Sequence, residues 1–168
     1  MNPSGKLTIT IPREVGQLPI YHDQKPSSHG FAYVDADNRP IFPFGYGLSY
    51  TTFNDSEPRL SATQMKTNGS VEVSTTVTNT GKVAGDEVVQ LYIHQKTGSV
   101  TRPVRELKGF RRISLAPGES QTVRFAITPD LLALYDMDLN RVVEPGEFEI
   151  TTGFSSDQGK TVPLHVIN

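Results

Sequence analysis

Hydrophobic and polar residues alternate with a period of two along most of the chain from residue 58 onward. In the segment 71–78, the odd-numbered positions hold Val or Thr and the even-numbered positions are all polar. This is the pattern of a half-buried β-strand, and the turn-forming residues 79–81 end it. The same alternation predicts further strands near residues 59–65, 88–93, 107–115, 122–127, 148–154 and 162–166.

About seven strands over ~110 residues are typical of a β-sandwich. No ten-residue helical pattern separates them, which argues against a parallel α/β fold. Residues 129–134 favour one helical turn with Pro129 at its start, and Gly109-Phe110 indicates a β-bulge. The predicted fold class is all-β: an immunoglobulin- or fibronectin type III-like antiparallel β-sandwich over residues 58–168, preceded by an irregular N-terminal extension.

Residues 1–57 have a different pattern. Residues 6–11 form a short strand candidate, and residues 12–43 are irregular, with several prolines and a glycine as breakers. A segment of that length without regular structure usually indicates a functional loop, a linker or a piece of a larger unit. A lone strand cannot bury both of its faces. We therefore expect residues 1–57 to be the tail of a preceding domain.

Composition and charge exclude several classes of protein. The chain has 168 residues and a formal net charge of −2, which argues against nonspecific binding to nucleic acid or to an anionic membrane. It has no Cys, so disulfide scaffolds, thiol catalysis and cysteine-ligated zinc are excluded. Since no apolar run approaches ~18 residues, we expect no membrane-spanning helix.

The segment 42–53 is unusually aromatic and reads Phe-Pro-Phe-Gly-Tyr-Gly-Leu-Ser-Tyr-Thr-Thr-Phe. Such a density of rings would bury a large area, so the favoured interpretation is a packing seam between domains. A second interpretation is sugar stacking, in which Tyr46 or Tyr50 presents a ring face to a substrate. A third is that rings left uncovered promote self-association of the chain through residues 1–57.

This segment closely resembles the one that joins the second domain to the C-terminal fibronectin-like domain in glycoside hydrolase family 3 β-glucosidases. Residues 2–7 and 11–21 look like the end of that family's α/β sandwich domain. Residues 102–110, 115–119 and 144–148 look like parts of its fibronectin type III-like domain. The resemblance extends over nearly the whole chain, in the family's order.

The resemblance implies an enzyme that hydrolyses terminal β-D-glucosyl residues by a retaining mechanism. In the family, the Asp nucleophile and the Glu acid/base lie in upstream domains, and neither motif occurs here. The chain alone is therefore expected to have no catalytic residue, no cofactor and no activity. Its implied partners are the catalytic domains of the parent enzyme. We expect the parent enzyme to be periplasmic or secreted.

Within that enzyme, the resemblance implies a structural and stabilising role, with a loop near the substrate entrance. His22 and His29 of the N-terminal loop, together with Tyr46 and Tyr50, are the candidates for contact with substrate, and carbohydrate is a ligand only of the intact protein. The alternative is a free-standing module that binds carbohydrate or protein, and the lack of Trp weighs against sugar binding. An autonomous hydrolase is a third hypothesis.

Two pairs of carboxylates lie close together in the sequence and are candidates for a catalytic pair. A retaining glycosidase needs two carboxyl groups about 5–5.5 Å apart beside a pocket. Glu147 and Glu149 are two residues apart on one predicted strand, on the face opposite its hydrophobic residues. We interpret them as a solvated outer face, and we interpret Asp86-Glu87 in the same way.

Asp136-x-Asp138-x-Asn140 followed by Glu147 matches the ligand spacing of an EF-hand loop. Arg141 stands where the sharp turn needs Gly, however, and the flanking segments look like strands rather than helices. The favoured interpretation is a polar connection between two strands, without a metal.

A basic cluster lies at residues 102–112, formed by Arg102, Arg105, Lys108, Arg111 and Arg112. On an alternating strand these cations divide between two faces, which disfavours a nucleic-acid site. Contact with an acidic surface of the upstream domains, or plain solvation, is the expectation.

Overall fold

The computed structural model describes residues 2–26 and 39–168, and its regular structure is almost entirely β. Within these residues the two helical segments are the 3₁₀-helix η1 (Val15–Gln17) and α1 (Pro129–Leu132), and α1 confirms the predicted helical turn. Neither these nor any other helix in the described residues has the length and apolar character needed to cross a membrane. The strands are β1 (Phe53–Asp55), β2 (Arg59–Leu60), β3 (Gln64–Lys66), β4 (Val71–Asn79), β5 (Gly85–Gln95), β6 (Glu106–Leu115), β7 (Ser120–Ile127), β8 (Leu134–Tyr135), β9 (Arg141–Val142), β10 (Gly146–Gly153) and β11 (Gly159–Ile167).

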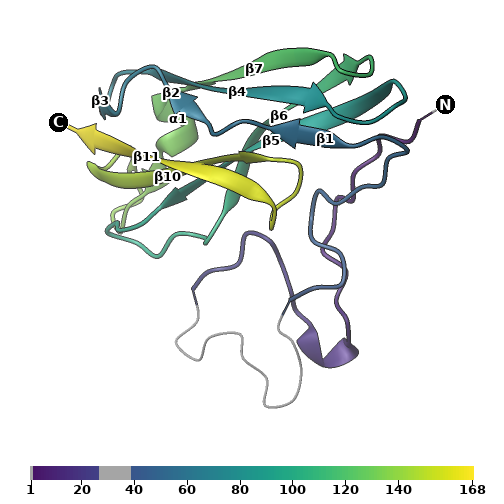
Figure 1. Cartoon of the computed structure of the whole chain (residues 1–168). Coiled ribbons are helices and arrows are strands. Elements are labelled where there is room, and N and C mark those ends of the chain that lie inside the picture. Colours follow the sequence, from purple (N-terminus) through teal and green to yellow (C-terminus); the bar gives the residue numbers. More distant parts are fainter. Residues whose placement is uncertain (1, 27–38) are drawn as a thin grey trace.

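Two sheets pack face to face, which confirms the predicted sandwich (Figure 1). In the first sheet β4 is central, with β7 on one side and β1 and β2 in succession along the other. The second sheet has the order β3-β11-β10-β5-β6. A short hairpin of β8 and β9 stands apart from both sheets.

The core forms where the hydrophobic positions of the two sheets meet. Along β4 every second residue is buried, which is the face that the alternation predicted. Fully burying a Val, Leu or Phe side chain contributes about 1.5–3 kcal/mol. The core residues include Val73, Val77, Val89, Leu91, Ile93, Ile113, Leu115, Val123, Phe125, Ile127, Phe148, Ile150, Leu164 and Val166.

The strand expected at residues 59–65 is divided between the two sheets. Its first part, β2, pairs with β4, and the chain then crosses to the second sheet, where β3 pairs with β11. The β3–β11 pair is parallel, so the sandwich is not antiparallel throughout. The crossing lets one short segment cover the edge of each sheet, which hides backbone groups that would otherwise be exposed.

The predicted β-bulge lies one residue earlier than expected. Leu91 pairs with Gly109 and Tyr92 pairs with Leu107, so Lys108 is the extra residue on β6. The bulge therefore interrupts an edge strand, where bulges are common.

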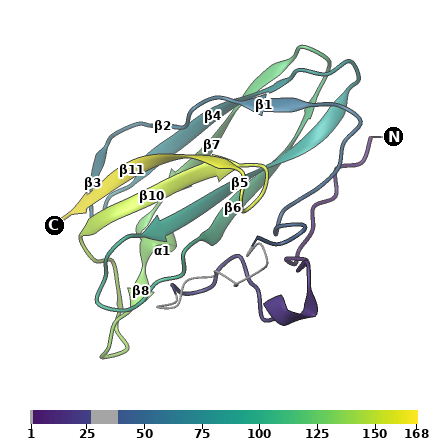
Figure 2. The same ribbon diagram turned by 60° about the horizontal axis from the view of Figure 1, so that its bottom comes forward.

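The N-terminal extension, here residues 2–26 and 39–52, runs beside the sandwich (Figures 1 and 2). The strand candidate at residues 6–11 lies against the aromatic segment rather than in either sheet, and it bends at Thr8 and Ile9. The amide of Leu7 donates to the carbonyl of Tyr46 over 2.8 Å, and the amide of Ile11 donates to the carbonyl of Phe42 over 2.8 Å. The sandwich itself begins at Phe53, the first residue of β1.

Candidate functional site

The central contact between the extension and the sandwich is a buried hydrogen-bond network on β5. The side chain of Gln90 is only 3% exposed. Its amide nitrogen donates to the carbonyl of Gly45 (3.2 Å) and to that of Phe154 (2.7 Å), and its oxygen accepts from the Tyr92 hydroxyl (2.5 Å). Burial raises the pKa of Tyr92, which keeps the phenol protonated as a donor.

Gly45 fits this network because it has no side chain. Its φ is +79°, a region that L-residues rarely adopt. A Cβ atom at this position would lie 2.2 Å from the Gln90 oxygen. Gly45 is therefore required both for the backbone conformation and for the close approach to β5.

His22 forms a ring stack between the extension and the second sheet. Its imidazole lies 3.9 Å from the ring of Phe44 at 16°, and it meets Tyr92 edge-on at 6.3 Å. Burial lowers the pKa of His22, and the charge of Asp23 partly offsets this effect. On the other side, the guanidinium of Arg105 lies 5.8 Å from the centre of the Tyr92 ring, a cation–π distance.

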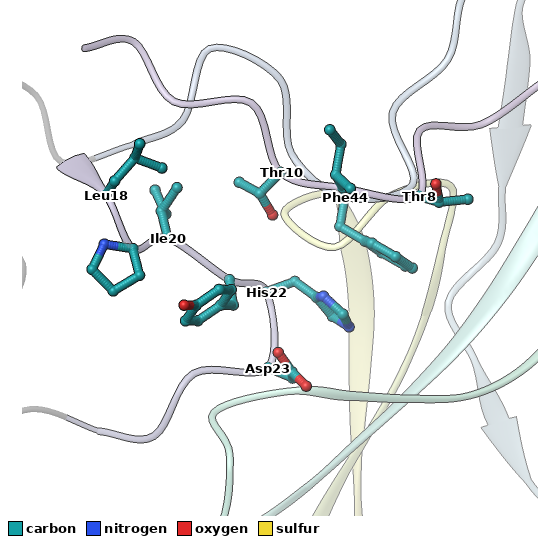
Figure 3. Close-up of a pocket in the computed structure, with 10 residues that line it drawn as sticks. Thr8, Thr10, Leu18, Ile20, His22, Asp23 and Phe44 are labelled. Atoms are coloured by element: carbon teal, nitrogen blue, oxygen red, sulfur yellow. The ribbon is translucent and has the colours of Figure 1, made fainter. Parts of the chain in front are cut away.

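An open groove of about 670 Å³ lies within the extension (Figure 3). The segment with Leu18, Ile20 and His22 forms one side, and the segment with Thr8 and Thr10 forms the other. The hydroxyl of Thr10 is buried and has no hydrogen-bond partner within the described residues. The groove is lined mostly by apolar side chains, so it suits an apolar occupant.

The start of the extension closes one open end of the sandwich. The Asn2 side chain donates to the Ser49 hydroxyl (2.9 Å) and accepts from the Tyr50 amide (2.8 Å). The Thr51 hydroxyl then donates to the side-chain oxygen of Asn79 (2.7 Å). These bonds tie residues 2 and 49–51 to the end of β4.

Asn79 is fully buried and uses its whole side-chain amide. Its nitrogen donates to the carbonyls of Val83 (2.8 Å) and Leu115 (3.0 Å), and its oxygen also accepts from the Gly81 amide (3.0 Å). Asn79 therefore joins the turn after β4, the end of β6 and the extension.

A salt bridge also fixes the extension at this end. The ammonium of Lys6 lies 2.6 Å from the carboxylate of Glu87, and both side chains are largely buried. The expectation that Glu87 belongs to a solvated face was therefore wrong, because residues 2–6 cover that end of β5. Asp86, its neighbour, is at the surface as expected.

Known proteins are similar to this chain over nearly its whole length. The fibronectin type III-like domain family matches residues 87–156. A β-xylosidase of Formosa agariphila is 50% identical over 99% of this chain and 24% of its own length. A periplasmic β-glucosidase of Salmonella typhimurium is 44% identical over 95% of this chain and 22% of its own length. The solved structure of a β-glucosidase from Erythrobacter marinus matches with a TM-score of 0.94 and 42% identity, over 99% of this chain and 22% of that one.

These matches run through the extension as well as the sandwich. The chain matches the C-terminal region of family 3 glycoside hydrolases. It spans about a quarter of the length of the curated relatives it matches and corresponds to their accessory C-terminal domain. The sequence-based resemblance is therefore confirmed at the level of family and region.

Of the four residues that the sequence placed near substrate in a family 3 enzyme, the structure describes three. His22 lines the groove, which includes neither Tyr46 nor Tyr50. The Tyr46 ring packs 4.9 Å from the Phe42 ring, and Tyr50 is 78% exposed near Asn2. The described part of the chain does not bring them together as one sugar-binding site. His29 lies outside the described residues.

Carboxylates on β10 behave as the outer face that the sequence predicted. Glu147 and Glu149 both pair with Lys96, at 2.5 and 3.4 Å. The hydrogen bond from Lys96 lowers the pKa of Glu147. Asp86 accepts from Ser114 and Arg112, and these two hydrogen bonds lower its pKa. None of these groups lines the groove.

The segment with EF-hand spacing is the β8–β9 turn. The carboxylate of Asp136 accepts from the amides of Asp138 and Asn140, both at 2.9 Å, and Leu139 has a φ of +63°. Asp136 therefore holds the turn itself. Across residues 2–26 and 39–168, no group of three or more His, Cys, Asp or Glu residues has the arrangement of a metal site.

Most of the basic cluster has partners inside the chain. Arg102 and Lys108 both pair with Glu106, at 2.5 and 2.6 Å. Arg112 pairs with Asp86, and Arg105 donates to the carbonyl of Ser156. Two carboxylates, Glu106 and Asp86, therefore offset part of the charge of the five cations.

Proposed function

We propose that this chain docks, through its N-terminal extension, onto the catalytic domains that precede it in a family 3 glycoside hydrolase. The sequence assigned residues 1–57 to the tail of such a domain, and the contact element in the proposal is the extension, residues 2–26 and 39–52. The complete enzyme would hydrolyse terminal β-linked glucosyl or xylosyl residues, the two activities in the relatives' names. This chain would stabilise the assembly without taking part in the chemistry.

The observation that carries the proposal is an exposed apolar surface concentrated on the extension. Within the described residues, eight of the fourteen exposed large hydrophobic side chains belong to it. They are Ile9, Val15, Leu18, Tyr21, Ile41, Phe42, Leu48 and Tyr50. Exposed apolar surface of this kind marks interaction sites. The proposed occupant of this surface is the part of the enzyme that precedes this chain. The relatives are about four times longer than the chain, and the extension lies before the sandwich in the sequence.

Backbone groups on the extension support docking by strand pairing. Leu7 and Ile11 direct their amides to the aromatic segment. Alternate residues of an extended chain direct their amides to opposite sides. Within the described ranges, the amides of Thr8 and Thr10 have no backbone partner. A strand of the preceding domain that pairs with this edge would satisfy them and cover the groove.

Docking can be tested with two separate polypeptides, this chain and the catalytic part of the same enzyme. Isothermal titration calorimetry of the mixture should give a complex of one copy of each. Leu18→Asp is expected to weaken it at least tenfold, because burial of one such side chain contributes about 1.5–3 kcal/mol. Leu18 is 58% exposed, so this variant should leave the sandwich folded.

Met137→Asp is the matched control for the docking experiment. Met137 is even more exposed, at 84%, and lies in the β8–β9 turn rather than in the extension. The proposal is refuted by a lack of association, by full affinity in Leu18→Asp, or by an equal loss in Met137→Asp. An assay with aryl β-glucoside and aryl β-xyloside should find no turnover by this chain alone.

The same surface gives the isolated chain a route to self-association. With the groove uncovered, two copies can bury their exposed hydrophobic side chains against each other. Sedimentation velocity over a range of concentrations should then show a dimer that Leu18→Asp removes and Met137→Asp retains. A strict monomer at every concentration would contradict this part of the proposal.

A further inference from the structure

A short part of the extension crosses the outer face of the second sheet. This strap comprises residues 20–26. His22 places its ring between Phe44 and the edge of Tyr92, and the carbonyl of Gln24 accepts from the amide of Val104 over 2.9 Å. The close-up shows the His22 and Phe44 rings turned toward each other (Figure 3). A surface segment outside both sheets can open without unfolding the sandwich.

We propose that the strap is a pH-sensitive latch, closed while His22 is neutral and opened when His22 is protonated. The reason is the position of the imidazole. A neutral ring packs well between two aromatic side chains, whereas an imidazolium there loses hydration that the surrounding rings do not replace.

The charged groups around the stack give no strong compensation for a proton on His22. Asp23, the next residue of the strap, is exposed and favours the proton weakly. From the loop before β6, the Arg105 cation already lies against the same Tyr92 ring. Asp157, after β10, acts on Tyr92 and is bound by the Ser155 hydroxyl. Attraction of an imidazolium to the Phe44 face also favours the proton, but burial is the largest effect on His22.

The direction of the pH effect follows from linkage. Burial lowers the pKa of His22 in the closed strap below the ordinary value of 6.5. The closed form therefore has its full stability above pH 6.5 and loses it as the pH falls through the lowered pKa. Each pKa unit of lowering makes the strap about tenfold easier to open at acidic pH.

Opening would alter the docking surface. Residues 18–23 form one wall of the groove, and residues 20–23 of that wall belong to the strap, so an open strap removes part of it. The consequence for domain docking rests on the proposed function. The latch itself does not, because it involves contacts inside this chain only.

Amide hydrogen exchange on the full chain tests the latch without any partner. The Val104 amide reports closure, because it donates to the strap, and the amide of Ile150 in the core is the reference. From about pH 8 to about pH 5, and after correction for intrinsic exchange, Val104 should lose protection about tenfold per unit of pKa lowering. Protection of Ile150 should stay constant.

His22→Phe keeps an aromatic ring in the stack and removes the titrating group. In this variant Val104 should stay protected at every pH. The latch is refuted if protection of Val104 is independent of pH in the natural chain, or if it depends on pH equally in the variant. If the variant leaves Val104 unprotected throughout, NMR titration of His22 in the natural chain decides. A midpoint below 6.5 supports the latch, and a midpoint at or above 6.5 refutes it.

Discussion

Replacing Gly45 by Ala is the most direct test of how the extension is held on the sandwich. The backbone there has a φ of +79°, which costs an L-residue about 1 kcal/mol. The new Cβ would lie 2.2 Å from the Gln90 oxygen, so the Gln90 side chain must move. Moving it breaks three hydrogen bonds, worth about 1 kcal/mol each. The extension is therefore expected to pack on the sandwich with about 4 kcal/mol less free energy.

Gly118→Ala separates strain from collision. Gly118 has a similar φ of +75° but nothing within 4 Å of its would-be Cβ, so only the strain of about 1 kcal/mol applies. The amide of Ser156, which donates to the Phe44 carbonyl over 2.9 Å, reports docking by hydrogen exchange. Protection of Ser156 should fall at least a hundredfold in Gly45→Ala and stay unchanged in Gly118→Ala.

A double variant checks that Gln90 is the residue displaced. Because Gly45→Ala already breaks the Gln90 bonds, adding Gln90→Ala should cost little more, whereas independent effects would add. The reasoning is refuted if Ser156 keeps its protection in Gly45→Ala. It is refuted equally if the two changes prove additive.

Three further changes test other contacts. Asn79→Ala should lower the free energy of unfolding in urea by about 3 kcal/mol, because several buried groups lose their partner; a loss below about 1 kcal/mol would contradict this. Lys6→Met should destabilise the chain by about 2 kcal/mol by leaving the Glu87 carboxylate unpaired, and adding Glu87→Leu should recover most of that. If the double variant does not recover stability, loss of the ion pair is not the cause of the destabilisation. Ser114→Ala should raise the pKa of Asp86 toward 3.8 in an NMR titration. The carboxylate would then contribute less to the stability that it provides above pH 3.8 and loses as the pH falls. An unchanged midpoint would exclude the Ser114 hydrogen bond as the main cause of the lowered pKa.

The alternation of hydrophobic and polar residues was sufficient to predict the sandwich, because it gives each strand one hydrophobic face. A shift of one residue in the pairing of a strand would turn that face to the solvent. The alternation could not show that residues 59–65 divide between two sheets. Leu60 and Met65 are five residues apart, so one continuous strand would direct them to opposite faces, but this spacing does not say which sheet each half joins. Only the pairing of β2 with β4 and of β3 with β11 distinguishes these arrangements, and those partners lie elsewhere in the sequence.

The contacts of the extension were harder to predict than the core. Gln90 and Gly45 are 45 residues apart, and neither is unusual in isolation. One signal was present: residues 88–93 are hydrophobic on both faces apart from Gln90. A strand of that kind is covered on both sides, so a polar residue within it must find a buried partner. Glu87 gave no such signal, because an Asp-Glu pair at the start of a strand is usually solvated.

The extension has two sides with different roles, and this explains how it can serve as a docking element. Its inner side is fixed to the sandwich by the Gln90 network, the Lys6–Glu87 pair and the Asn79 contacts. Its outer side presents the groove and the exposed hydrophobic residues. A surface held in place before binding loses less conformational entropy when it docks. Variants that loosen the inner side, such as Gly45→Ala, should therefore weaken docking even though they leave the outer side chains unchanged.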